Sequence, residues 1–97
     1  MAANGASSAA ANMLSPTPGT TLSGASQAFT WTMASGATGH ALYAGSSLGS
    51  YNYFASLFNG SAGTATGLPT NGSTVYVRLF TNFNGAWQSR DYTYTAR

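Results

Sequence analysis

Residues 27–33 show the clearest alternation of apolar and polar side chains in the chain. Phe29, Trp31 and Met33 fall at every second position, with threonines between them. The same alternation recurs in two later segments, residues 74–81 and 86–96. Because successive side chains of a strand point to opposite faces of its sheet, each segment predicts a strand with one buried face. We therefore expect Trp31 to be largely buried between two sheets.

Turn signals divide the rest of the chain into short segments. Three Asn-Gly dipeptides begin at positions 59, 71 and 84, at intervals of 12 and 13 residues. Asn-Gly favours tight turns because both residues tolerate a positive φ angle. No helical periodicity of any length is present. We therefore predict an all-β fold, a two-sheet antiparallel sandwich of about seven strands. The expected strands are residues 20–23, 27–33, 39–45, 51–58, 62–66, 74–81 and 86–96.

The first 13 residues differ in composition from the rest of the chain. They are mainly Ala, Ser, Asn and Gly, without the basic start and continuous apolar stretch of a signal peptide. This composition is typical of a flexible linker. Residues 2–12 carry too little large apolar surface to offset the entropy lost on ordering them, so we predict that they are mobile in a monomer. The folded domain is expected to span residues 14–97.

Charged residues make up only 4% of the 97-residue chain, against roughly 25% in an average globular protein. Lysine, glutamate and cysteine are absent, and uncharged hydroxyl and amide groups take their place. Such surfaces are typical of secreted and cell-surface proteins. Three scattered arginines do not form the basic stripe of a nucleic-acid binder. No apolar run approaches the roughly 20 residues that a membrane helix needs. We expect a secreted or cell-surface protein with no nucleic-acid partner and no membrane insertion.

Catalytic and metal chemistry lack the residues that they need. Asp91 is the only side-chain carboxylate, whereas glycoside hydrolysis usually uses two. His40 is expected to point inward with Leu42 while Asp91 points outward from another strand, which separates two members of any Ser-His-Asp triad. One histidine and one aspartate cannot supply the three or four ligands of a zinc site. We predict no enzyme activity, no metal site and no cofactor.

A two-residue turn at Asn84-Gly85 would fix the pairing of the last two strands. Residues whose numbers sum to 169 then lie opposite each other, so that Arg78 faces Asp91. A slip of one residue would put these two on opposite faces, so their pairing supports the register. Strand 39–45 is expected beside strand 74–81, with Tyr43 next to Tyr76 on the same outer face. The candidate binding residues of this face are Tyr43, Tyr76, Arg78, Phe80, Trp87 and Asp91.

Two interpretations of this aromatic face remain open. Exposed aromatic side chains beside hydrogen-bonding groups can stack on sugar rings or anchor protein partners. Cross-strand aromatic pairs can also serve only to stabilise a sheet face, or a neighbouring domain can cover them. The pair of Arg78 and Asp91 can likewise do no more than stabilise its hairpin.

Short motifs also carry a family resemblance. Trp31 on the second expected strand, Gly-Leu-Pro at residues 67–69 and the alternating residues 74–79 together resemble a fibronectin type III domain. In that family a tryptophan lies on strand B, and a Leu-Pro turn leads into strand F. The stretch from Leu14 to Ala96 is similar to fibronectin type III or immunoglobulin-like modules of large secreted or surface bacterial proteins. The resemblance implies that residues 14–97 form such a β-sandwich.

These observations favour a noncatalytic extracellular module that serves as a spacer or as a binding domain. If it binds, we expect a glycan or a protein on the outer aromatic face, or neighbouring domains of a larger chain. The alternative is a self-assembling structural subunit of the filament or surface-layer type. Its sheet edges almost lack the charges that usually prevent strand pairing. Its N-terminal segment could then add as a strand to a neighbouring copy.

Overall fold

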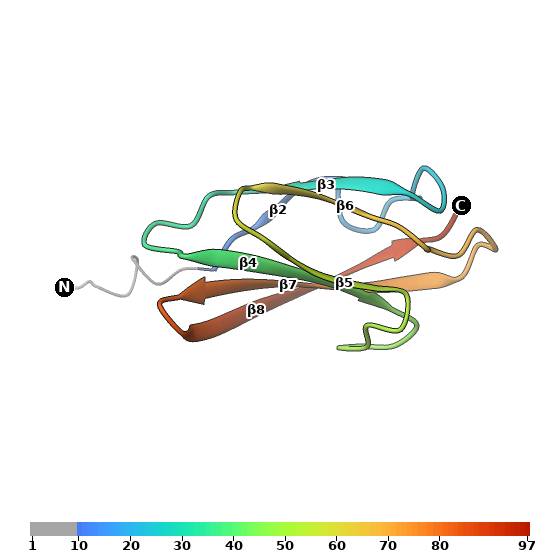
Figure 1. Ribbon diagram of the computed structural model, residues 1–97. Coiled ribbons are helices and arrows are strands. Elements are labelled where there is room, and N and C mark those ends of the chain that lie inside the picture. The colour runs from blue at the N-terminus through green and yellow to red at the C-terminus, as the bar shows by residue number, and fades with distance from the viewer. Residues whose placement is uncertain (1–9) are drawn as a thin grey trace.

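The computed structural model describes residues 10–97 as two antiparallel β-sheets packed face to face (Figure 1). One sheet has three strands in the order β2-β3-β6, and the other has four in the order β5-β4-β7-β8. No helix occurs among the described residues. The chain is therefore an all-β sandwich, as the sequence predicts. The strands are β2 (Met13–Ser15), β3 (Gln27–Trp31), β4 (Gly39–Gly45), β5 (Phe54–Phe58), β6 (Ala62–Ala65), β7 (Thr74–Phe83) and β8 (Ala86–Thr95).

The hairpin of β7 and β8 has the predicted register. Asn84 and Gly85 form its turn with φ angles of 55° and 99°, which an Asn-Gly pair adopts with little strain. Arg78 lies opposite Asp91, and Val77 lies opposite Tyr92. The other two Asn-Gly dipeptides close no hairpin, because β5 pairs with β4 whereas β6 pairs with β3. The chain crosses between the sheets at Asn59-Gly60, and again between β6 and β7.

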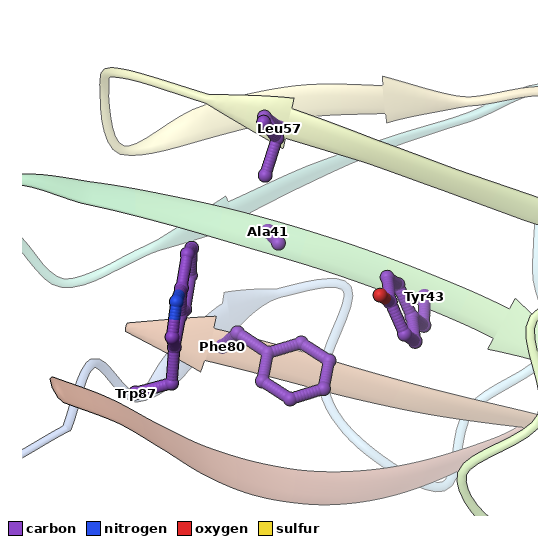
Figure 2. Close-up of a pocket in the computed structure, with 5 residues that line it drawn as sticks. All are labelled: Ala41, Tyr43, Leu57, Phe80 and Trp87. Carbon is purple, nitrogen blue, oxygen red and sulfur yellow. The ribbon is translucent and has the colours of Figure 1, made fainter. Parts of the chain in front are cut away.

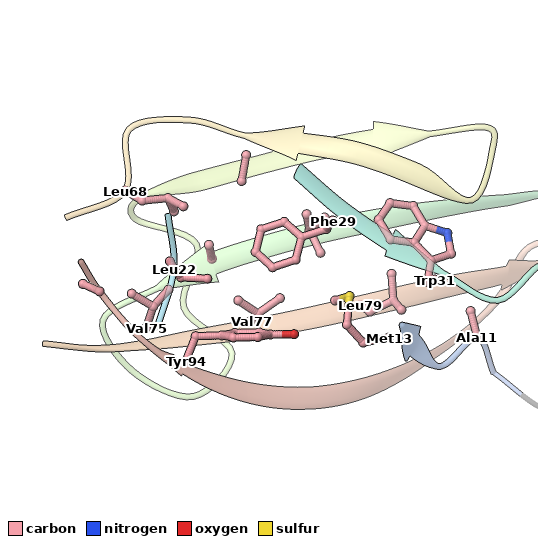
Figure 3. Close-up of a cluster of buried hydrophobic side chains, with 14 residues drawn as sticks. Ala11, Met13, Leu22, Phe29, Trp31, Leu68, Val75, Val77, Leu79 and Tyr94 are labelled. Carbon is pink, nitrogen blue, oxygen red and sulfur yellow. The ribbon is translucent and has the colours of Figure 1, made fainter. Parts of the chain in front are cut away.

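The core lies between the two sheets, as Figure 3 shows. Trp31 is only 1% exposed, which confirms the prediction of its burial, and its indole nitrogen donates a hydrogen bond to the carbonyl of Gly60. The Phe58 ring packs against Gly63 of β6, where a Cβ atom would come within about 2.5 Å of the ring. The absence of a side chain at position 63 therefore lets the two sheets approach. The largest buried side chains of the core are Trp31, Tyr94, Phe29, Leu22, Leu42 and Leu79.

Two strand predictions need correction. Met33, expected on the inner face, is 66% exposed, because β3 ends at Trp31 and the chain turns away over the next residues. Residues 20–23 form no strand, since the edge position beside β3 is taken by β2. They make one isolated parallel bridge instead, between Thr21 and Thr95. Leu22 is nevertheless buried in the core.

Residues 10–13 also differ from the expectation of a linker, and the remainder of that segment, residues 1–9, lies outside the described residues. Ala11 and Met13 belong to the core cluster. The main-chain amide of Ala11 donates to the Thr81 hydroxyl, and that of Met13 donates to the Tyr92 hydroxyl, each at 3.0 Å. These bonds come from the main chain, which explains why composition did not reveal them. The described fold therefore includes residue 10.

Candidate binding face

The outer face is the side of the four-stranded sheet that points away from β2, β3 and β6. Pairing registers place its residues in rows that run across the strands. In one row Ala55, Tyr43, Arg78 and Asp91 lie side by side from β5 to β8. In the next row, toward the Asn84-Gly85 turn, the order is Leu57, Ala41, Phe80 and Ser89. The first row, which contains Arg78 and Asp91, is here called the polar row. It lies directly beside the second, mainly apolar row.

Four aromatic rings form a continuous file on this face. Trp87 meets Phe80 edge-on, with ring centroids 6.1 Å apart. The ring centroids of Phe80 and Tyr43 are 4.7 Å apart, and those of Tyr43 and Tyr51 are 4.9 Å apart. The file starts on β8, crosses β7 and β4, and ends in the loop between β4 and β5. Trp87 and Tyr51 are exposed at its two ends.

A hollow of about 400 Å³ opens beside this file, and Figure 2 shows its lining. The small side chain of Ala41 lies between Trp87 and Tyr43, which stand on two sides of the hollow. Ala41 itself is buried, whereas Trp87 is 48% exposed. The hollow exists because the side chain at position 41 is only a methyl group, whereas the residues around it are large. The lining residues are Ala41, Tyr43, Leu57, Phe80 and Trp87.

The ion pair of Arg78 and Asp91 lies in the row next to the hollow. Arg78 donates from Nε to Oδ1 at 2.6 Å and from Nη2 to Oδ2 at 3.1 Å. The hydrogen bond to Asp91 raises the pKa of the Arg78 guanidinium, which therefore stays charged. Gly49 follows β4 and approaches the same guanidinium so closely that a Cβ atom there would lie 3.1 Å from Nη1. The pair is thus neutral as a unit, and a loop covers one side of it.

The structure brings together some of the predicted site residues and separates others. Tyr43, Phe80 and Trp87 line the hollow, and Arg78 and Asp91 flank it. Tyr76 does not line the hollow, since it lies opposite Gly45, near the loop that follows β4. Tyr43 was expected next to Tyr76, but it lies directly opposite Arg78 and contacts the rings of Phe80 and Tyr51. The difference arises because the register between β4 and β7 is shifted by two residues from the expected one.

Sequence reasoning missed Ala41 and Leu57. Leu57 lies on β5, and its place at the hollow depends on the pairing of β5 with β4, where Ala41 lies opposite Leu57. The sequence contains no signal that assigns β5 to this sheet rather than to the other one. Alternation along residues 39–45 does put Ala41 on the same face as Tyr43, so the sequence alone could have placed Ala41 on the outer face.

His40 and Asp91 lie on opposite faces of the same sheet. His40 points into the core against Trp31, with ring centroids 5.7 Å apart, and its two ring nitrogens have no hydrogen-bond partner. Desolvation by burial lowers the pKa of His40. Asp91 faces solvent and is bonded to Arg78. Among residues 10–97, no three side chains of the His, Cys, Asp and Glu types gather where they could hold a metal ion.

Comparisons with family models, curated proteins and solved structures find no match to this chain. Within the described part of the chain, no helix is long and apolar enough to cross a membrane.

Proposed function

We propose that the chain is a noncatalytic, fibronectin type III-like module of a secreted or cell-surface protein, and that its outer face binds an uncharged glycan. The observation that carries this proposal is the hollow over Ala41 beside the aromatic file. Ligand sites are concave and largely apolar, with a few polar groups that fix the orientation of the ligand. The hollow and the adjacent ion pair have this composition.

The size and shape of the hollow favour a single ring. Its volume of about 400 Å³ lies at the lower end of the range for small-molecule sites. The exposed indole of Trp87 offers a flat surface on one side, and Tyr43 bounds the other. The ring of a pyranose sugar has carbon–hydrogen bonds on its faces and hydroxyl groups at its edge. It could therefore stack on Trp87 while its hydroxyl groups reach the polar row.

Charge favours a neutral ligand over an acidic one. Arg78 is the cation in the row beside the hollow, and Asp91 engages it at two points. Asp91 already neutralises Arg78 and would repel a carboxylate or sulfate group placed at the same guanidinium. A neutral sugar can accept and donate hydrogen bonds at the rim without this repulsion.

A glycan array followed by titration of the best ligand tests the proposal. The Ala41→Leu variant fills the hollow from its floor and keeps every aromatic ring, so we expect at least about a tenfold loss of affinity. Trp87→Ala removes one wall and should weaken binding at least as much. Leu48→Ala is the matched control, because Leu48 is an exposed apolar residue that does not line the hollow.

Two outcomes would contradict the proposal. An array on which no uncharged glycan binds would reject this ligand class, and the aromatic file would then serve the stability of the sheet or a protein contact. Full affinity in a folded Ala41→Leu variant would place the glycan elsewhere on the molecule.

A further inference from the structure

The segment of residues 10–15, here called the strap, closes one side of the sandwich between the two sheets. On the three-stranded sheet, β2 pairs with β3, and the main chains of Asn12 and Thr32 are hydrogen bonded at 2.8 Å. On the four-stranded sheet, the amides of Ala11 and Met13 bond to the hydroxyls of Thr81 and Tyr92. The strap thus contacts β3, β7 and β8 at once.

Most of these contacts use the main chain of the strap. The amides of three successive residues, Ala11, Asn12 and Met13, all donate to side-chain hydroxyl groups at 2.8–3.0 Å. Arg90 also donates to the carbonyl of Ala10. Met13 is the one large apolar side chain that the strap buries. Because little apolar area holds it, the strap should open more readily than the rest of the fold.

Opening would leave a defined seat. The edge of β3 would lose its neighbour, and the Thr81 hydroxyl, which is fully buried in the closed form, would lose its donor. The unpaired edge of β3 and the hydroxyl groups of Thr81 and Tyr92 would offer hydrogen bonds to an extended chain, so the vacant seat would favour rebinding one. The residues that hold the strap include a single charge, that of Arg90, so no lysine opposes an added strand.

The chain after the strap is anchored separately. The Tyr94 hydroxyl donates to the carbonyl of Pro16 at 2.9 Å, and the amide of Gly19 donates to the carbonyl of Thr93 at 2.8 Å. Both anchors lie on β8, beyond the end of β2. The strap can therefore leave its seat without release of the rest of the domain.

We propose that this seat is an acceptor site for the strap of a second copy, so that two or more chains can join by strand exchange. The occupant is the same extended peptide that fills the seat within one chain, with small side chains at positions 10 and 11 and Met at position 13. The proposal does not depend on ligand binding at the outer face, which lies on the opposite side of the four-stranded sheet.

A peptide-binding experiment with the full chain tests this. The Ala11→Asp variant places a carboxylate at a buried position, so its own strap should leave the seat. A labelled peptide of residues 10–18 should then bind this variant at least about tenfold more tightly than it binds the unmodified chain. Leu14→Asp is the matched control, because Leu14 lies on the strap but is 59% exposed. Equal peptide affinity for folded Ala11→Asp and Leu14→Asp would overturn the proposal.

Disulfide trapping gives a second readout that leaves the buried position 11 unchanged. The chain has no cysteine, so Asn12→Cys and Thr32→Cys variants, one of them tagged, can be refolded together with oxidised glutathione. Strand exchange predicts a cross-linked heterodimer in excess over both homodimers. The mixture of Leu14→Cys with Thr32→Cys should show no such excess, since Thr32 is hydrogen bonded to Asn12 and not to Leu14. Equal cross-linking in the two mixtures would also overturn the proposal.

Discussion

The imidazole of His40 packs against the indole of Trp31 in the core, with ring centroids 5.7 Å apart and no hydrogen-bond partner for either imidazole nitrogen. A histidine in this position is stable only in its neutral form, because burial disfavours the charge. The domain therefore holds one titratable group whose protonation opposes folding near neutral pH.

The first prediction is that stability falls as the pH drops below about 6.5. Burial lowers the pKa of folded His40 below its ordinary value of 6.5, so the unfolded chain binds more protons in this range. The contribution of neutral His40 to the free energy of unfolding is complete above pH 6.5, and it is lost as the pH falls toward the lower pKa of the folded state. Urea titrations at pH 7.5 and pH 5 measure the change. His40→Leu should remove this dependence and should be no less stable at pH 7.5, since it leaves no buried nitrogen unpaired. An equal loss of stability between pH 7.5 and pH 5 in the unmodified protein and in His40→Leu would refute the assignment to His40.

The second prediction contrasts the two tryptophans. Trp31→Ala opens a cavity between the sheets and removes the bond to Gly60, so unfolding free energy should fall by about 3–5 kcal/mol. Trp87→Ala and Tyr76→Ala remove outer-face side chains and should each change it by less than about 1.5 kcal/mol. Urea denaturation followed by circular dichroism compares the three variants. A loss of several kcal/mol in Trp87→Ala would mark the aromatic file as structural.

The third prediction concerns the contact between Gly63 and Phe58. A Cβ atom at position 63 would lie about 2.5 Å from the Phe58 ring, so Gly63→Ala must displace that ring from the core edge. We expect a destabilisation of about 1–3 kcal/mol. Gly60→Ala is the control, because no atom beyond its two neighbours in the chain lies within 4 Å of its added methyl group. Thermal unfolding that does not distinguish the two variants would argue against this packing.

The fourth prediction is that the ion pair of Arg78 and Asp91 adds little to stability. Both side chains are about one-third exposed, at 29% and 35%, so solvent screens their attraction. Asp91→Asn should cost less than about 1 kcal/mol, and the difference should shrink in high salt. If the outer face binds a neutral glycan, the same variant should also let Arg78 bind acidic glycans. Parallel denaturation at low and high salt, with an acidic-glycan titration, checks both statements.

The sequence predicted most of the hairpin because its determinants are local. Asn84-Gly85 favours one turn type, and a register that pairs Arg78 with Asp91 also buries Val75, Val77 and Leu79 on one face. The hollow was not predicted, because it depends on which sheet β5 joins and at what register, and only long-range contacts decide this. The strap was missed for a different reason. Its main-chain amides bond to Thr81 and Tyr92, and main-chain hydrogen bonds leave no trace in composition.

The parallel bridge between Thr21 and Thr95 has a mechanical consequence. The strap is bonded to Thr81 and Arg90, on the side of the Asn84-Gly85 turn, whereas β8 ends at the opposite pole of a molecule 47 Å long and 20 Å wide (Figure 1). Tension between the two ends would pull β8 and residues 19–22 in opposite directions along their length. The bonds that join them, from Gly19 to Thr93, Leu22 to Thr95 and Thr95 to Thr20, would then be loaded together in shear. Bonds loaded together resist force better than bonds that open one at a time, so this short pairing should act as a mechanical clamp.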